Sequence, residues 1–348
     1  MNFQYERPVA GEGLRLHLNE NTAGCSPRVL EVLRALTREQ AAFYPDYDHA
    51  ARACARRFGV SLDNVLLTNG LDEGILLTAM VALRGGPASD PFEAIVVQPA
   101  FDMYAACADA AGGRIIDIPP QSDFFFPLNK VMKAITAKTR VIFLTNPNNP
   151  TGLSIPRASI AAVARAAPQA LVLLDEAYAD FSGETMIDEA VSGTIPNLLI
   201  GRTFAKAYGL AGLRVGALIA SAASLAPMRR VVPPYSLNVY AAAALPAAFE
   251  DVDYYDWYLA EVRESKKVLY ETLAQNHIRF WPSDGNFVLA CFGDDLDRVL
   301  ARLADRGINI RDRSGDPGCA GCARITAGVV EHTRRLVTAL QEVLCGAR

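Results

Sequence analysis

The stretch of residues 202–216 holds a single lysine, Lys206, among small and apolar residues. Thr203 lies three positions before this lysine and Arg214 eight positions after it. Loss of hydration favours the neutral form of an amine, which is a nucleophile toward a carbonyl carbon. A hydroxyl and a guanidinium are suited to bind an anion such as a phosphate. A lone lysine of this kind is also typical of an ordinary helix surface. The residues upstream therefore have to distinguish a catalytic lysine from a surface lysine.

A carboxylate and two other polar side chains follow apolar segments upstream of the lysine. Asp175 comes directly after Leu-Val-Leu-Leu, so its carboxylate is poorly solvated and requires a cationic partner, which a protonated pyridine nitrogen would provide. Tyr178 would reach a neighbouring ring oxygen. Asn149, in a loop of Asn and Pro, would donate a hydrogen bond to an oxygen. In isolation, Asp175 is equally suited to cap a helix and Asn149 to form a turn.

A glycine-containing turn provides a further candidate for anion binding. Gly70, Leu71 and Asp72 stand where a strand-like segment gives way to a helical one. The free backbone N–H groups at a helix start bind phosphate readily, although an ordinary turn has the same sequence character.

These candidates follow a repeated pattern of apolar segments and helices. Each strand-like run ends in a polar or turn residue and leads into a helical stretch; the runs are residues 65–68, 94–98, 141–144 and 171–174. Continuous apolar strands separated by helices predict an α/β fold with a mostly parallel sheet covered on both faces. Ligands of such sheets bind at the carboxyl ends of the strands, where these polar residues fall. Before this region, the pattern predicts an extended segment at 14–18 and helices at 28–36 and 50–58.

Composition excludes several classes of function. The 348 residues are 51% hydrophobic and 21% charged, with a net charge of -4 and no long charge runs, so neither a nucleic-acid nor a membrane surface is expected. We expect a cytoplasmic protein. The seven cysteines are odd in number and mostly scattered, as free thiols are. Cys319 and Cys322 form a C-x-x-C, but zinc would need a second ligand pair and the four histidines are isolated, so no metal site is expected.

Taken together, the motifs resemble those of fold-type I pyridoxal-phosphate-dependent aminotransferases of class I and II. The motifs are Asn-Pro-Asn-Asn-Pro-Thr-Gly at 146–152, Asp-Glu-Ala-Tyr at 175–178, Thr203-x-x-Lys206, and Arg214. Their spacings (175 - 149 = 26 and 206 - 175 = 31) fit that family. Within it, the chain is most similar to histidinol-phosphate aminotransferases, through Gly-Leu-Asp-Glu at 70–73, Pro-Pro-Tyr at 233–235, Ile-Arg-Asp at 310–312 and Gly-Cys-Ala-Arg-Ile-Thr at 321–326.

The resemblance implies roles around a pyridoxal 5'-phosphate cofactor. Lys206 would carry the cofactor as a Schiff base and later move a proton at the substrate alpha carbon. Asp175 would keep the pyridine nitrogen protonated, so that the ring accepts electrons. Asn149 and Tyr178 would bond the ring hydroxyl oxygen, and Phe101, or alternatively Tyr104, would stack on the ring face.

The resemblance also implies how the phosphate and the substrate are held. The phosphate would be bound by the backbone of Gly70, Leu71 and Asp72, by Thr203 and Arg214, and by Tyr44 of a second subunit, so a homodimer is expected. Substrate would meet Arg324, Arg311 and Asn149. The expected amino donor is histidinol phosphate, in histidine biosynthesis, and the expected acceptor is 2-oxoglutarate.

One departure from the family pattern bears on the substrate. Where the family has Asn-Glu-Asn-Pro-Tyr-Gly, this chain has Asn-Glu-Asn-Thr-Ala-Gly at 19–24, so Ala23 replaces an aromatic hydroxyl. Losing one hydrogen bond to a charged group costs about 1.5 to 3 kcal/mol. Two alternatives therefore stay open: an aminotransferase of aromatic or other amino acids, and a decarboxylase of the same fold acting on a phosphorylated amino acid.

The expected domain organisation follows from the same resemblance. Residues 1–29 would form an N-terminal arm that contributes to the small domain, residues 30–244 a large cofactor-binding domain, and residues 245–348 the small domain. A helix over residues 252–275 would join the two domains.

Overall fold

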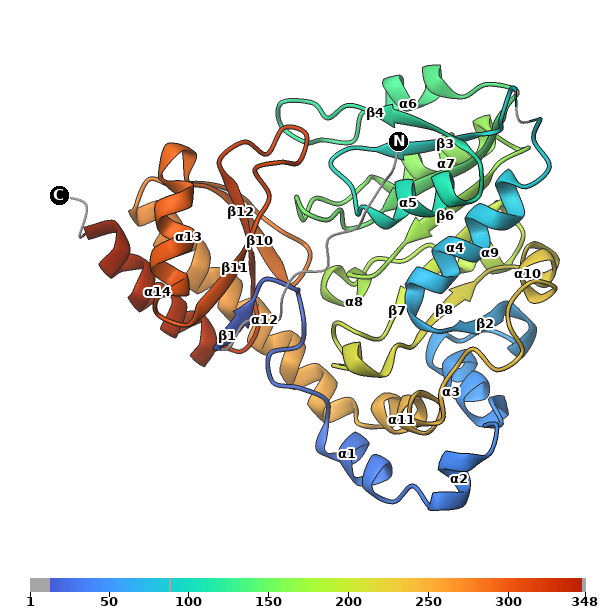
Figure 1. The fold of residues 1–348 in the computed structure, drawn as a ribbon, viewed down its shortest axis with the longest axis horizontal. Helices are drawn as coiled ribbons and strands as arrows, with labels where there is room; N and C mark the ends of the chain where they lie inside the picture. Colours follow the sequence, from blue (N-terminus) through green and yellow to red (C-terminus); the bar gives the residue numbers. More distant parts are fainter. Residues whose placement is uncertain (1–12, 88, 346–348) are drawn as a thin grey trace.

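Two β-sheets organise the chain, as the computed structural model in Figure 1 shows. The structure describes residues 13–87 and 89–345; residues 1–12 of the expected arm and the last three residues lie outside that range. The larger sheet has the strand order β2-β8-β7-β6-β5-β3-β4. Its strands are β2 (Val65–Thr68), β3 (Glu93–Val97), β4 (Arg114–Ile118), β5 (Thr139–Thr145), β6 (Leu171–Asp175), β7 (Leu198–Thr203) and β8 (Gly216–Ile219).

The large sheet is mostly parallel and is apolar on both faces. Strands β4, β3, β5, β6 and β7 pair in parallel, whereas β8 runs antiparallel to both β7 and β2. Alternate residues of β5 point to opposite sides: Phe143 belongs to the core cluster beneath one helix layer, and Ile142 and Leu144 belong to the cluster beneath the other. This two-sided burial explains why the strands read as continuous apolar runs.

Helices cover both faces of this sheet. One side is packed by α4 (Gly70–Leu83), α5 (Met103–Ala110) and α10 (Ala222–Arg229). The opposite side is packed by α1 (Pro27–Arg34), α3 (Asp48–Phe58), α6 (Leu128–Ala134), α7 (Arg157–Ala166), α9 (Ile187–Val191) and α11 (Val239–Glu250). Two short helices, α2 (Arg38–Ala42) and α8 (Ala179–Ser182), complete this part of the chain.

A second, five-stranded sheet receives strands from both ends of the chain. Its order is β1-β11-β12-β10-β9, with β1 parallel to β11 and the other pairs antiparallel. The elements are β1 (Leu14–Leu16), β9 (Arg279–Trp281), β10 (Phe287–Cys291), β11 (Ile308–Asp312) and β12 (Cys322–Thr326), with the helices α13 (Leu296–Ala304) and α14 (Val330–Cys345).

The long helix α12 (Val252–Gln275) connects the two sheets. Tyr255 near its start packs on the core of the large sheet, whereas Tyr258, Val262 and Leu269 belong to the core of the small one. The chain therefore passes from one core to the other within a single helix.

The predicted fold class is confirmed: an α/β protein with a mostly parallel main sheet and a smaller C-terminal sheet. The first helix is shorter than the predicted 28–36. It ends at Arg34 because Thr37 starts a separate helix, with its hydroxyl accepting from the backbone of Gln40 and the Gln40 side chain accepting from the Thr37 backbone. Within the described residues, no helix combines the length and apolar character needed to cross a bilayer.

Candidate active site

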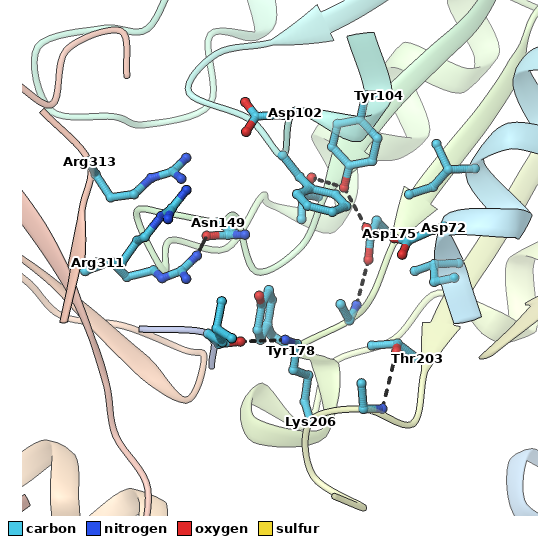
Figure 2. Close-up of a pocket in the computed structure, with 18 of the residues that line it drawn as sticks. Asp72, Asp102, Tyr104, Asn149, Asp175, Tyr178, Thr203, Lys206, Arg311 and Arg313 are labelled. Carbon is cyan, nitrogen blue, oxygen red and sulfur yellow. Dashed lines mark hydrogen bonds between the residues drawn. The ribbon is translucent and has the colours of Figure 1, made fainter. Parts of the chain in front are cut away.

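One cavity is lined by residues from both sheets (Figure 2). Most of the residues singled out in the sequence line it: Leu71, Asp72, Phe101, Asn149, Asp175, Tyr178, Thr203, Lys206, Arg214, Arg311 and Arg324. Residues that sequence reasoning gave no site role, Leu18, Asp102, Thr145 and Arg313, line it as well. The carboxyl ends of β5, β6 and β7 form its large-sheet side, where a parallel sheet is expected to bind ligands.

Lys206 lies in the loop after β7, with its side chain inside the cavity. Its Nζ donates to the backbone oxygen of Leu18 at 3.0 Å, and Asn21 donates to the carbonyl of the adjacent Ala207 at 3.0 Å. The N-terminal segment therefore fixes the lysine loop from across the cavity. Burial, and then the positive charge of Arg324, lower the pKa of the Lys206 amine to about 8.

This lowered pKa predicts a specific pH dependence of cofactor loading. Since only the neutral amine attacks an aldehyde, the rate at which cofactor-free enzyme takes up pyridoxal 5'-phosphate should rise with pH and level off above about 8. An ordinary lysine would instead gain roughly tenfold per pH unit up to about pH 10. Stopped-flow absorbance from pH 6 to 10 measures this rate. Nα-acetyl-lysine under the same conditions is the control. If the rate with the enzyme levels off at as high a pH as the rate with Nα-acetyl-lysine, the prediction is wrong.

Asp175 ends β6 and is almost completely buried at the bottom of the cavity. Oδ1 of its carboxylate accepts from the backbone N–H of Ala177 at 2.9 Å, and Oδ2 accepts from the hydroxyl of Tyr104 at 2.6 Å. Burial raises the pKa of the Asp175 carboxyl to about 6, although these two hydrogen bonds act in the opposite direction. A cationic ring nitrogen would compensate the desolvated charge.

Tyr178 follows Asp175 at the same end of the sheet and is also buried. Its hydroxyl oxygen accepts from Asn19 Nδ2 at 3.1 Å, and burial raises the pKa of the Tyr178 phenol. Because Asn19 occupies the oxygen as a donor, the phenolic hydrogen of Tyr178 stays available for an acceptor in the cavity. Asn19 stands in the polar stretch noted at 19–24, but sequence alone gave it no partner.

The start of α4 and Arg214 form an anion site at one end of the cavity. Asn69 precedes the helix, and its side chain accepts no hydrogen bond from the first N–H groups of α4. Gly70 has φ +72°, and a Cβ there would lie 2.5 Å from Nη2 of Arg214. Glycine therefore allows the guanidinium to lie over the helix start, where it also contacts Asp72 at 2.6 Å. This set of donors fits a phosphate.

Phe101 and Tyr104 occupy different levels of the cavity. Phe101 is partly exposed, whereas Tyr104 is fully buried and meets it edge-on, with the ring centroids 5.8 Å apart. Tyr104 stacks instead on Phe143 of β5 at 5.1 Å.

Three arginines on or next to β11 and β12 line the cavity, and Figure 2 shows two of them, Arg311 and Arg313, at the end opposite Asp72 and Thr203. Arg311 and Arg324 are direct cross-strand partners on β11 and β12, and Arg313 stands two positions after Arg311, just beyond the end of β11. Arg324 is 6% exposed, and it donates to Asn149 Oδ1 at 2.5 Å and to the backbone oxygen of His17 at 2.8 Å. Arg313 pairs with Asp316. Burial, and the nearby Arg313 and Arg311, lower the pKa of Arg324 to about 10.

Two residues from the sequence analysis lie away from this cavity. Tyr44 is 75% exposed and stacks on Tyr235 with centroids 4.0 Å apart. Ala23 is exposed and lines a separate open depression with Arg15 and His332, which shares only Ala205 with the main cavity. Cys319 and Cys322 are buried free thiols that pack with Leu289 and do not line the cavity, and no group of three ligand residues in the described ranges is arranged for a metal.

The comparisons with known proteins agree with this geometry. The model of the family "Aminotransferase class I and II" matches residues 12–340. The chain belongs to this family. It is 33% identical over 334 residues to a histidinol-phosphate aminotransferase of Symbiobacterium thermophilum, covering 95% of this chain and 90% of the relative. It is 35% identical over 346 residues to histidinol-phosphate aminotransferase 2 of Ralstonia nicotianae, covering 96% and 89%.

Solved structures give the same result for the fold. The histidinol-phosphate aminotransferase of Sinorhizobium meliloti in complex with pyridoxal-5'-phosphate superimposes with a TM-score of 0.86 at 25% identity, over 97% of this chain and 92% of that one. Family membership confirms the sequence prediction of a pyridoxal-phosphate-dependent aminotransferase similar to histidinol-phosphate aminotransferases.

Proposed function

We propose that this aminotransferase moves an amino group between histidinol phosphate and 2-oxoglutarate, as a step in histidine biosynthesis. The observation that carries the proposal is the buried Arg324, which has no carboxylate partner among the described residues and stands directly opposite Arg311 on the neighbouring strand. Like charges placed directly opposite on neighbouring strands repel, and an unpaired buried charge is costly. An anionic group of the substrate would relieve both costs. The full-length similarity to histidinol-phosphate aminotransferases supports a phosphate as one such group.

Pyridoxal phosphate would lie between the two charged ends of the cavity. When bound, it serves as an electron sink for the substrate alpha carbon. The start of α4, Thr203 and Arg214 would hold its phosphate. Asp175 would face the ring nitrogen, and Asn149 and Tyr178 the ring hydroxyl oxygen. Phe101 would cover one face of the ring.

Lys206 would transfer the proton at the substrate alpha carbon. Its pKa of about 8, lowered by burial, places it near the value at which one group both accepts and returns a proton at neutral pH. Arg324 and Arg311 would orient the substrate, so that its alpha hydrogen points at the Lys206 amine. Asn149 would connect the cofactor site with the substrate site, because Arg324 donates to its side-chain oxygen.

We further propose a homodimer in which Tyr44 reaches the phosphate site of the partner subunit. The exposed Tyr44 and Tyr235 form a stacked pair, and Phe43 beside them is 70% exposed. Such apolar area is typical of a surface covered by another chain. Analytical ultracentrifugation should show a dimer, and Tyr44→Ala should weaken cofactor affinity roughly tenfold, the value of one hydrogen bond to a charged group. A monomer with full activity would contradict this proposal.

The same site indicates which domain binds the cofactor and which binds the substrate. We propose that residues 30–244 carry the cofactor and residues 245–348, joined by the N-terminal arm 1–29, supply the substrate arginines. The β1 strand lies in the small sheet beside β11, which supports this assignment.

A substrate panel tests the proposed function. Single-turnover absorbance of the cofactor-loaded enzyme is followed after mixing with histidinol phosphate, phenylalanine, tyrosine, histidine, glutamate or threonine phosphate. We expect histidinol phosphate to convert the cofactor to its amine form faster than phenylalanine, tyrosine, histidine or threonine phosphate does. Faster conversion by an aromatic amino acid would reject the substrate, and release of carbon dioxide from threonine phosphate would identify a decarboxylase instead.

A further inference from the structure

Tyr104 makes the shortest side-chain contact at the buried end of the cavity. It lies in the first turn of α5, is fully buried, and donates its hydroxyl to Asp175 Oδ2 at 2.6 Å. Thr145, the last residue of β5, lies with Oγ1 2.8 Å from the same hydroxyl. Figure 2 shows Tyr104 directed at Asp175 from the helix side. This hydroxyl is therefore enclosed by two partners and does not face substrate.

The order of donors in this trio is fixed by chemistry. An ionised carboxylate only accepts hydrogen bonds, and a phenol has one hydrogen, so Tyr104 must give its hydrogen to Asp175. Thr145 must then donate to the phenolic oxygen. Burial and the adjacent carboxylate raise the pKa of the Tyr104 phenol well above its ordinary value, so the hydroxyl remains a donor at every working pH. The chain runs in one direction and ends on the carboxylate.

We propose that Tyr104, supported by Thr145, is a positioning residue that holds the Asp175 carboxylate ionised and oriented toward the cofactor ring nitrogen. The inference rests on the proposed function in one respect, that Asp175 is the partner of that nitrogen. In the described residues two donors reach this carboxylate, Tyr104 and the backbone N–H of Ala177. Of these, Tyr104 is the one that a side-chain substitution removes.

The variant Tyr104→Phe isolates this hydroxyl. The ring packs on Phe143 at 5.1 Å with an interplanar angle of 11°, and phenylalanine keeps that packing. Tyr255→Phe is the matched control, because it removes another tyrosine hydroxyl that donates to a carboxylate, Asp180, at 2.9 Å outside the cavity. Thr145→Val, an isosteric change, removes the first donor of the chain and serves as a second variant.

The measurement is the affinity of full-length, cofactor-stripped enzyme for pyridoxamine 5'-phosphate between pH 5.5 and 8. This probe has no aldehyde, so the titration of Lys206 does not enter through covalent attachment. A hydrogen bond to the charged form of an acid lowers its pKa, so loss of the Tyr104 bond should move the acid-side weakening of binding to higher pH by about one unit. With the wild-type pKa of Asp175 at about 6, the Tyr104→Phe variant should bind close to tenfold more weakly than wild type at pH 5.5, about twofold more weakly at pH 7, and equally well by pH 8. Thr145→Val should shift the curve in the same direction by less.

The outcomes separate this inference from the proposed function. A ratio of variant to wild-type affinity that stays constant across the pH range, or an equal pH shift in Tyr255→Phe, would overturn the role of Tyr104. Failure of the wild-type enzyme to bind pyridoxamine 5'-phosphate at any pH would overturn the cofactor assignment itself, and the inference with it.

Discussion

Replacing Lys206 with alanine should reduce the turnover number by at least about a thousandfold, because one side chain supplies both the cofactor attachment and the proton transfer. The amine is held in place by the Leu18 carbonyl at 3.0 Å, and none of the other residues around the cavity is a lysine. Water entering the space left by the side chain would be a far weaker base. Steady-state kinetics with histidinol phosphate and 2-oxoglutarate measures the loss.

Two controls make this result specific. Lys267→Ala removes a lysine from the exposed side of α12, where it pairs with Glu264, and should leave turnover unchanged. After borohydride reduction of the wild-type enzyme, mass spectrometry should find the cofactor on the peptide that contains Lys206 and not on that of Lys267. Turnover within tenfold of wild type in Lys206→Ala would reject the lysine as the central residue.

Replacing Arg324 with glutamine should lower kcat/KM by roughly 10² to 10³, equivalent to about 3 to 4 kcal/mol of lost binding. Arg324 is 6% exposed, and its guanidinium lies over Phe287, with 5.6 Å between the Arg324 Cζ and the Phe287 ring centroid. A substrate anion would thus be bound in a poorly solvated place, where a charged partner contributes most. Glutamine preserves polarity but not the charge, so the effect should fall mainly on KM.

Measuring both half-reactions shows which anion Arg324 binds. A larger loss with glutamate than with histidinol phosphate assigns Arg324 to a carboxylate, and the reverse assigns it to the phosphate. Arg334→Gln, on the exposed side of α14, is the charge-matched control. Because Arg324 also bonds Asn149 and the His17 carbonyl, the melting temperature of each variant is compared with wild type. Unchanged kinetics in both half-reactions of a folded variant would remove Arg324 from substrate binding.

The sequence by itself determined four strands of the large sheet and the family. The strand β2 has the bounds of the predicted run 65–68, and β6 extends the predicted run 171–174 by one residue to Asp175, because burial on both faces of a sheet requires uninterrupted apolar residues. The motifs that contain Asn149, Asp175 and Lys206, in this order and at spacings that fit the family, identified the aminotransferase family, because a multi-residue site places several residue types at fixed separations. Each of these features lies within a short segment of the chain.

Only the tertiary structure decided which side chains complete the site. Tyr104 reads in the sequence as a second aromatic near Phe101, yet it is a hydrogen-bond donor to Asp175, 71 positions away. Asn19 reaches Tyr178 across 159 positions, and Leu18 reaches Lys206 across 188. The contacts of Asn19 and Leu18 depend on β1 joining the small sheet beside β11, and a three-residue strand has too little pattern to reveal its partner. Contacts between residues far apart in the sequence depend on how whole layers of the fold pack, and the spacing of residues within one segment does not predict that packing.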